Sequence, residues 1–351
     1  MDRSGLDAPT IVGMEHIDPV AGSGASVSFD DVLRHRGELF VHCYRMLGSR
    51  TDAEDVLQET MTAAWRGVPD FEERSSLRTW LYRIATNRSL NARRARTRRP
   101  ETAQLPFYPP TPTSHDSTWW LEPFPDDQPA TVTDPADEAT VRADLALGFV
   151  VALQALPGRQ TAALLLHDVV GFDRSEVAAL LDTTTTGVKG LLQRARRAVP
   201  AARDPVPRRV EQELVDGFVD ALRTGDVDAL VALLTSDAVL TMPPLELVYE
   251  GASAIAAFLR ASLAWLPSRR VEIAQLRCNG APAFVHTIDG GDVGSTGLVV
   301  LQLADVGISR ITRFLAPHVI ERAAHNVPAP CNGGHQPAAT DRGGPSHAPT
   351  G

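Results

Sequence analysis

The sequence predicts a multidomain protein in which two all-α helical units are followed by an α+β unit. The chain has 351 residues, more than one typical domain, which leaves room for two or three separate cores. Apolar residues recur at helical spacing in residues 29–100 and again in residues 139–200. In residues 208–322, amphipathic helices are interleaved with short apolar runs typical of strands. This last pattern favours helices on one face of a curved sheet.

Composition and targeting signals exclude several classes of protein. No run of eighteen apolar residues is present, and residues 1–20 lack the basic-then-apolar order of a secretory signal. The protein is therefore expected in the cytoplasm, without a membrane contact. Cys43, Cys278 and Cys331 are far apart and form no CxxC pair, so neither a disulfide framework nor a metal site is expected. No motif in the sequence indicates a cofactor.

The first helical unit follows residues 1–28, which mix Gly, Ser, Asp and Pro without periodicity and are expected to be disordered. Helical spacing begins at Phe29 and continues until Gly48 supplies a stop. Either Ser49 or Thr51 is placed to cap the next helix, because an acidic residue follows each of them three positions later.

That next helix runs to about Trp65 and carries a polar face opposite its apolar stripe. Asp55, Gln58 and Glu59 lie on this polar face. Its two carboxylates, four residues apart, repel one another mildly unless a basic partner pairs with them. From spacing alone, a solvated face is the simpler interpretation.

The most basic stretch is residues 71–100, where nine arginines and two glutamates give a local charge of +7, against −9 for the whole chain. A polar loop leads into a long helix that Ser75 or Ser76 can cap and that reaches about Arg96. Trp80 is interpreted equally well as a core residue or as part of a site. Another face of this helix carries groups suited to phosphates and base edges, namely Arg83, Asn87, Asn91 and Arg94.

Residues 101–138 form a linker that is rich in Pro and Thr and contains eight carboxylates but no Lys or Arg. This acidic linker could lie in a basic channel, mimic nucleic acid, or stay solvated. Inside it, the sequence TWWLEPFPDD forms an apolar knot that a flexible spacer would not need. Docking on another surface is therefore predicted for Trp119, Trp120, Leu121 and Pro123.

The second helical unit, residues 139–200, ends in a helix-turn-helix pattern. Asp182 occupies the turn, where glycine is usual because the backbone there tends to be left-handed. The second helix of the pair is predicted to begin at about Thr185. It exposes side chains suited to the major groove and its flanking phosphates, namely Thr186, Lys189, Gln193, Arg194 and Arg197.

The third unit contains candidates for acid–base chemistry but no convincing pair. These candidates are Asp237, Tyr249, His286 and Asp289. Because a lone histidine is more often structural than catalytic, we do not expect an enzyme. Sensing or docking is favoured for this unit, and residues 323–351 are expected to form a disordered tail.

Three segments, DAEDVLQET, SSLRTWLYRIATNRSLNARR and LPGRQTAALLLHDVVGFDRSEVAALL, resemble bacterial sigma factors of the extracytoplasmic-function group. The first two resemble sigma region two and the third resembles region four. FVDALRTGDVDALVALLTSDAVLTMPP resembles the SnoaL-like, NTF2-like cone domains that some of these factors carry at the C-terminus, with a WLEP-type motif in the linker. The resemblance implies a region-two bundle, a region-four helix-turn-helix and an α+β cone domain.

The resemblance also implies partners. In this family, region two binds a coiled coil of the largest subunit of core RNA polymerase, which makes Asp55, Gln58 and Glu59 candidates for that contact. The loop before the long helix captures a base flipped from the minus-ten element of promoter DNA, and an aromatic at the position of Trp80 wedges at the melted edge. Unstacking a base costs a few kcal/mol, and stacking it on an aromatic side chain returns roughly 1–3 kcal/mol.

The same resemblance extends to the individual DNA contacts. Minus-ten contacts are expected from Phe71, Glu72, Glu73, Arg74, Ser75, Ser76, Trp80, Arg83, Asn87, Asn91 and Arg94. Minus-thirty-five contacts are expected from Thr186, Lys189, Gln193 and Arg194, with Arg196 and Arg197 on phosphates.

Two interpretations of the C-terminal unit stay open. In a sigma factor, it is expected to modulate the sigma regions in place of a separate anti-sigma protein. The alternative is a helix-turn-helix regulator that acts without polymerase and senses a small molecule in this unit, which leaves the region-two resemblance without an explanation. A small-molecule ligand in this domain is compatible with both.

Overall fold

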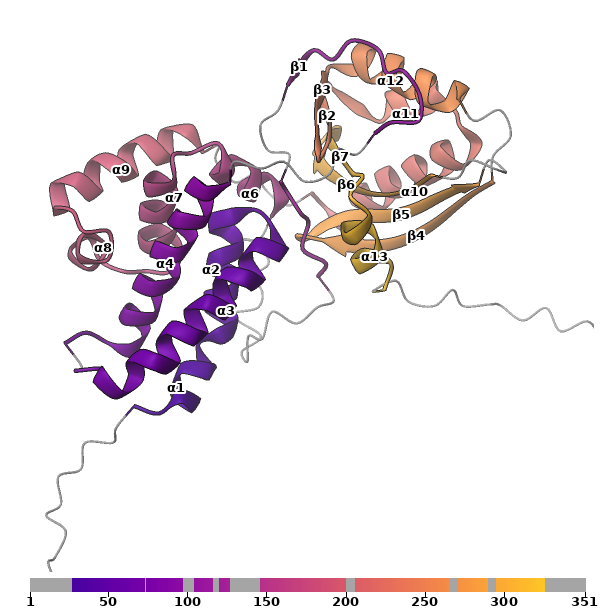
Figure 1. Ribbon diagram of the computed structural model, residues 1–351. Helices are drawn as coiled ribbons and strands as arrows, with labels where there is room; N and C mark the ends of the chain where they lie inside the picture. The colour runs from indigo at the N-terminus through magenta and orange to yellow at the C-terminus, as the bar shows by residue number, and fades with distance from the viewer. Residues whose placement is uncertain are drawn as a thin grey trace, which may run out of the picture.

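The computed structural model describes residues 27–72, 74–96, 104–115, 120–126, 146–199, 206–265, 270–289 and 295–325. Figure 1 shows the helices α1–α9 side by side in one part of the molecule and a curved sheet with its own helices in the other. The predicted division into two helical units and an α+β unit is confirmed.

The first helical unit consists of α1 (Phe29–Arg34), α2 (Arg36–Leu47), α3 (Arg50–Gly67) and α4 (Leu77–Ala95). The prediction of a single helix from Phe29 to Gly48 was wrong. His35 separates α1 from α2, because its backbone N–H turns back to the carbonyl oxygens of α1. Gly48 ends α2 with φ 71°, a left-handed conformation that glycine adopts at little cost.

Serine side chains cap the N-termini of three of these helices. Ser28, Ser49 and Ser76 each accept a hydrogen bond from a backbone N–H in the first turn of α1, α3 and α4 respectively. Ser49 and Ser76 are therefore the caps among the alternatives that the sequence left open. A short 3-10 turn, Val68–Asp70, carries the chain from α3 toward the loop before α4.

The second helical unit consists of α6 (Leu147–Gln154), α7 (Gly158–Leu164), a π-helical turn (Leu165–Val169), α8 (Arg174–Leu180) and α9 (Thr185–Ala198). Asp182 lies in the turn between α8 and α9 with φ 49°. This is the left-handed backbone that the helix-turn-helix pattern required of it. The predicted start of α9 is confirmed, and the Thr184 hydroxyl caps it by accepting from the N–H of Gly187.

The cone domain contains α10 (Arg208–Thr224), α11 (Val227–Ala232), β2 (Leu234–Met242), β3 (Leu245–Glu250), α12 (Ala252–Ala264), β4 (Arg270–Cys278), β5 (Ala281–Asp289), β6 (Ser295–Ala304), β7 (Gly307–Phe314) and α13 (Pro317–Ala324). The strand order is β1-β3-β2-β7-β6-β5-β4, and β1 (Ser114–His115) comes from the linker. All neighbours are antiparallel except β2 and β7, which are parallel.

Three elements of this domain were not predicted from the sequence. These are β1, β3 and α13. Ala323 and Ala324, which were expected in the disordered tail, belong to α13. The rest of that tail and residues 1–26 lie outside the described residues.

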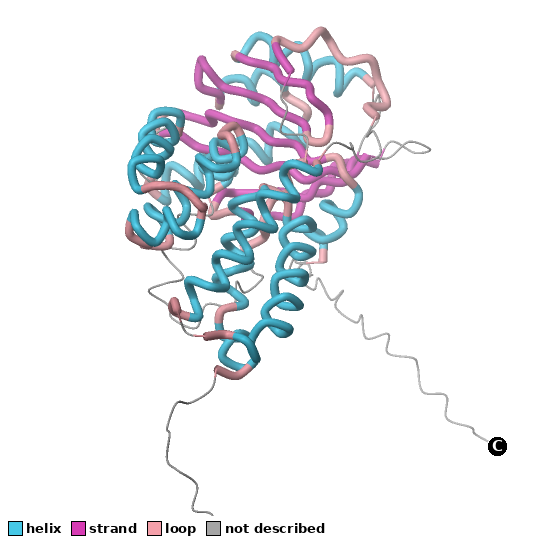
Figure 2. The backbone as a smooth tube through the Cα atoms, turned by 60° about the vertical axis from the view of Figure 1, so that its left-hand side comes forward, coloured by secondary structure: helices cyan, strands magenta, loops and turns pink. Residues whose placement is uncertain are grey.

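The two faces of the sheet belong to two hydrophobic cores. The inner face packs against α10, α11 and α12, and its core includes Phe218, Phe258, Phe284, Val299 and Leu301. Side chains of the opposite face, together with α13 and part of the linker, join the core of the helical units; they include Leu121, Phe124, Cys278, Leu298, Phe314 and Val319. Figure 2 shows the helices of those units in front of the sheet. A continuous apolar core therefore connects the cone domain to the helical units.

Candidate nucleic-acid interface

The exposed face of α4 carries four of the side chains that were assigned to minus-ten DNA. Arg83, Asn87, Asn91 and Arg94 are all exposed and follow one another at helical spacing. Nη1 of Arg94 lies 3.4 Å from Oδ1 of Asn91. A row of guanidinium and amide groups of this kind can bind phosphate oxygens and base edges.

Trp80 lies at the base of the loop that precedes α4. Its ring packs on the ring of Phe71, with 5.1 Å between the centroids. On α3, a Cβ at Gly67 would come within 2.8 Å of the Trp80 ring, so this close approach depends on glycine. Trp80 is half-buried. It therefore contributes to packing and also reaches the surface beside the loop.

The loop itself is exposed. Arg74, Ser75 and Ser76 have exposed side chains, and Arg74 forms an ion pair with the exposed Glu72. Glu73 lies outside the described residues. The loop therefore presents both signs of charge and hydroxyl groups next to the aromatic pair.

Several arginines of the basic segment hold the protein together instead of facing solvent. Arg78 forms an ion pair with Glu38 at 3.0 Å. Its guanidinium also lies 5.0 Å from the ring of Tyr82 and 5.2 Å from that of Phe172, which joins α4 to the second helical unit. Arg96 donates to the carbonyl oxygen of Leu47 at 3.0 Å. The sequence could not separate these side chains from the exposed ones, because all of them lie in one basic run.

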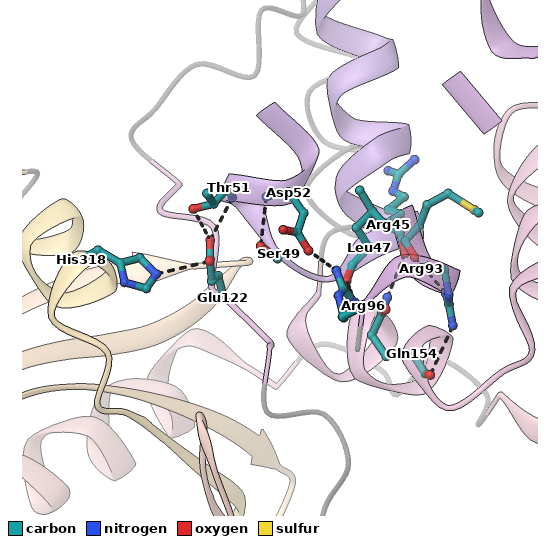
Figure 3. A network of polar contacts seen from close by, with 11 residues as sticks. Arg45, Leu47, Ser49, Thr51, Asp52, Arg93, Arg96, Glu122, Gln154 and His318 are labelled. Atoms are coloured by element: carbon teal, nitrogen blue, oxygen red, sulfur yellow. Dashed lines mark hydrogen bonds and ion pairs between the residues drawn. The ribbon is translucent and has the colours of Figure 1, made fainter. Parts of the chain in front are cut away.

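Arg93 forms four hydrogen bonds with the segments packed against α4. Its Nη1 and Nη2 donate at 2.8 Å to the carbonyl oxygens of Met46 and Leu156, respectively. Longer contacts reach the carbonyl of Gln154 at 3.4 Å and the hydroxyl of Thr161 at 3.3 Å. Figure 3 shows Arg93 between the end of α2 and Gln154 of α6. Burial, and to a lesser degree the charge of Arg96, lower the pKa of Arg93 to about 10, so it stays protonated near neutral pH.

The face of α3 that was assigned to core polymerase is open to solvent. Asp55, Gln58 and Glu59 are all exposed. Nη1 of Arg88 lies 2.6 Å from the Glu59 carboxylate and partly balances this acidic face. An exposed pair of this kind contributes little to stability and can be exchanged for another basic partner.

The exposed face of α9 carries the side chains that were assigned to minus-thirty-five DNA. Thr186, Lys189, Gln193, Arg194 and Arg197 are exposed. Arg196 differs from them, because its Nε and Nη2 bind both carboxylate oxygens of Asp168 at 2.8 and 2.5 Å. This bidentate pairing raises the pKa of Arg196. Arg196 therefore ties the end of α9 to the π-helical turn, and a phosphate would have to compete with Asp168 for it.

The apolar knot of the linker lies between the first helical unit and the cone domain. We call residues 120–126 the strap. Leu121 and Pro123 are buried, and the ring of Phe124 packs against those of Phe40 and Tyr44 of α2. Trp120 is half-buried beneath the guanidinium of Arg96, 4.7 Å from the ring centroid. Trp119 lies outside the described residues.

Glu122 ties the strap to the first helical unit by polar contacts. Its backbone N–H donates to the carbonyl of Gly48 at 2.9 Å. Its carboxylate accepts from the N–H and the hydroxyl of Thr51 at 3.0 and 3.1 Å, in the first turn of α3. His318 of α13 approaches the same carboxylate at 3.4 Å (Figure 3). Glu122 is thus held at a helix N-terminus and does not lie on the exposed face of α4.

Asn279 ties the strap to the turn between β4 and β5. Its backbone N–H donates to the carbonyl of Phe124, and its Oδ1 accepts from the N–H of Phe124, both at 2.7 Å. Its Nδ2 donates to the hydroxyl of Tyr44 at 3.1 Å, and that hydroxyl donates to the carbonyl of Glu122 at 2.8 Å. Asn279 is buried and has φ 55°. One side chain therefore joins the strap, α2 and the cone domain.

The acid–base candidates of the cone domain have separate environments. The hydroxyl of Tyr249 donates to the carbonyl of Pro110 in the linker at 2.7 Å. His286 is buried; burial, and then the charge of Arg313, lower its pKa to about 3, so the ring is neutral. Asp237 is exposed on β2, and the side chain of Asp289 lies outside the described part of the chain.

Two features are absent from the described residues. No group of three or more His, Cys, Asp or Glu side chains suited to a metal ion is present among them. Within the same part of the chain, no helix is both long and apolar enough to cross a membrane.

Models of three protein families match successive parts of the chain. Sigma-70 region 2 matches residues 32–99, Sigma-70, region 4 matches residues 147–199, and the SnoaL-like domain matches residues 215–313. The fold, the exposed faces of α4 and α9 and these matches define a sigma factor of the sigma-70 class with a fused cone domain.

Curated relatives make the family more specific. The chain is 38% identical over 296 residues to the ECF RNA polymerase sigma factor SigG of Mycobacterium tuberculosis, covering 80% of this chain and 79% of that one. It is 31% identical over 211 residues to SigJ of the same species, covering 59% and 62%. The chain belongs to the extracytoplasmic-function (ECF) RNA polymerase sigma factors, which direct transcription initiation and are not enzymes.

A solved structure supports the arrangement of domains. The crystal structure of SigJ of Mycobacterium tuberculosis superposes with a TM-score of 0.60 at 21% sequence identity, covering 83% of this chain and 98% of that one. At this identity the similarity concerns the fold. It covers most of the chain, including the succession of sigma regions and cone domain.

Proposed function

We propose that the cone domain of this sigma factor acts as a built-in modulator that holds regions 2 and 4 in a closed arrangement until core polymerase binds. The contacts of the strap are the main observation that supports this proposal. Asn279, Glu122 and Tyr44 connect the strap to both region 2 and the cone domain. Because the strap is held against both region 2 and the cone domain, the chain segment that leads to region 4 starts from a fixed point.

Distances on DNA support the need for such a movement. By their names, the minus-ten and minus-thirty-five elements lie about 25 base pairs apart, or roughly 85 Å along straight DNA. In the structure, region 4 packs directly on α4, whose 19 residues span only about 28 Å. The closed arrangement therefore cannot bind both elements at the same time. Promoter binding requires that the Arg93 hydrogen bonds between the two regions break.

In this proposal each exposed face binds a different partner. Core polymerase binds the acidic face of α3, because Asp55, Gln58 and Glu59 can meet a basic partner there. Minus-ten DNA binds the loop from Phe71 to Ser76, Trp80 and the exposed row on α4. Minus-thirty-five DNA binds α9 in the major groove, and Arg196 joins these contacts when Asp168 releases it.

The modulator proposal predicts that Asn279→Gly increases transcription. Glycine keeps the left-handed backbone at this position but removes the amide that binds Phe124 and Tyr44. We expect at least about fivefold more run-off transcript from genomic DNA at limiting core polymerase, since each of these two hydrogen bonds contributes roughly 1 kcal/mol to the closed state.

Asp305→Gly in the exposed turn between β6 and β7 is the matched control and should leave transcription unchanged. If Asn279→Gly lowers the thermal stability of the protein but leaves transcription at the wild-type level, the strap has only a structural role and the modulator proposal is wrong.

A further inference from the structure

The linker segment before the strap fills an aromatic site on the cone domain. We propose that this site binds a planar aromatic molecule carrying an oxygen acceptor, which displaces Phe107 and Pro110 and so releases the linker. This inference rests on the proposed modulator function, because it names the ligand class that would open the closed arrangement. We call residues 104–115 the edge segment.

The apolar half of the site is a cluster of rings. Phe107 packs against Phe258 of α12 at 5.7 Å between centroids and against Trp265 at 6.5 Å. The ring of Tyr249 lies 4.9 Å from that of Phe258 and continues the cluster toward the sheet. Tilted contacts at these distances are the arrangement that aromatic rings favour. The site is thus shaped for one further ring, which the linker supplies.

The polar half of the site is the hydroxyl of Tyr249. It donates to the carbonyl oxygen of Pro110 at 2.7 Å, and burial raises the pKa of this hydroxyl, which keeps it a donor. A buried donor that loses its acceptor is costly. A competing molecule must therefore bring its own oxygen acceptor as well as a ring.

The edge segment is held to the sheet by one short strand and by the side chains of Thr113 and Ser114. Its strand β1 comprises two residues, Ser114 and His115, paired with β3. Beyond this pairing, the N–H and the hydroxyl of Thr113 both donate to the carbonyl of Val248 at 2.9 Å, and the hydroxyl accepts from the N–H of Glu250 at the same distance. The hydroxyl of Ser114 donates to the Glu250 carboxylate at 3.2 Å. These contacts are confined to one edge of the sheet, so the segment can open locally while the other strands stay paired.

The site is also accessible from solvent. Phe107 is only half-buried, whereas its neighbour Tyr108 is 97% exposed. One side of the inserted ring is therefore open, and a ligand can approach there without unfolding of the cone domain. The adjacent Tyr108 provides a matched control, because it is an aromatic of the same segment that does not enter the site.

The test uses the full chain without polymerase and 4-fluorophenol as the probe, observed by fluorine NMR. We expect Phe107→Ala to bind this probe at least about tenfold more tightly than wild type, because it empties an apolar site. Tyr108→Ala should bind like wild type. Fluorobenzene, which lacks the acceptor, should bind Phe107→Ala several-fold more weakly than 4-fluorophenol.

Wild-type protein provides a second readout that does not depend on the folding of a variant. Saturating 4-fluorophenol should increase deuterium uptake in residues 104–115 and leave the strands β6 and β7 unchanged. Equal probe affinity of Phe107→Ala and wild type, or no change in uptake on binding, would overturn the inference. Because no polymerase is present, these results are independent of the transcription test of Asn279→Gly.

Discussion

Reversing two charges by Asp55→Lys and Glu59→Lys is expected to weaken the binding of the sigma factor to core RNA polymerase about 100-fold. Like charges placed opposite one another at an interface cost several kcal/mol, and each 1.4 kcal/mol corresponds to a tenfold change in affinity. Both side chains are exposed on α3, so the fold should tolerate the change. Titration of fluorescently labelled protein with core polymerase measures the effect.

A matched control exists on α10, where Asp216 and Asp220 are also exposed carboxylates four residues apart. Asp216→Lys with Asp220→Lys changes the net charge by the same amount at a site away from region 2. We expect this control to bind core polymerase within about threefold of wild type, since surface charges far from an interface act only through screened fields. Similar losses for both double variants would show that net charge, and not the α3 face, controls binding.

The second large effect is expected from Arg93→Ala. This change removes the donor to the carbonyl oxygens of Met46 and Leu156 at the junction of regions 2 and 4. Hydrogen bonds from a charged donor contribute about 1.5–3 kcal/mol each, and buried acceptors that lose their donor add a desolvation cost. We expect the free energy of unfolding to fall by about 3 kcal/mol, measured by urea denaturation.

Arg94→Ala is the neighbouring control. Arg94 is exposed on the face of α4 that we assign to DNA, so its loss should leave the free energy of unfolding within about 0.5 kcal/mol of wild type. Binding of single-stranded minus-ten DNA to the holoenzyme should instead weaken. If Arg94→Ala destabilises the protein as much as Arg93→Ala, the division of this arginine run into structural and DNA-binding members is wrong.

Local signals in the sequence predicted much of the fold. The stop at Gly48, the alternatives for the caps and the start of α9 follow from side chains that act within one or two turns of their own helix. Strands within residues 208–322 were predicted because apolar runs bounded by turn residues mark them. The exposure of the assigned faces on α3, α4 and α9 likewise follows from helical spacing.

Features that depend on distant partners could not be predicted. Arg93 and Arg94 are adjacent in one basic run, yet contacts with α2 and with the loop after α6 leave the first half-buried, whereas the second is exposed. The strand β1 has too little apolar pattern to be recognised without its partner β3. Asn279 gives no signal of its own, because its importance comes from Phe124, more than 150 residues earlier.

The position of the acidic linker also depends on distant partners and could not be predicted from its sequence. Its charge was compatible with a basic channel, with mimicry of nucleic acid or with a solvated linker. Of its eight carboxylates, the structure describes Glu122 and Asp126. Glu122 binds the start of α3, and Asp126 accepts from the N–H of Gly280 in the turn after β4 at 2.9 Å. Local hydrogen-bond donors, which net charge does not reveal, thus determine where these two side chains lie.

Deuterium exchange in the strap, compared between the free chain and the holoenzyme with core polymerase, tests the closed arrangement most directly. The N–H groups of Glu122, Phe124 and Asn279 form its hydrogen bonds, while those of β6 and β7 serve as an internal control. We predict protection of the strap in the free chain and exchange at least about tenfold faster in the holoenzyme, which corresponds to roughly 1.4 kcal/mol of lost stabilisation. Equal or stronger protection of the strap in the holoenzyme would contradict the account.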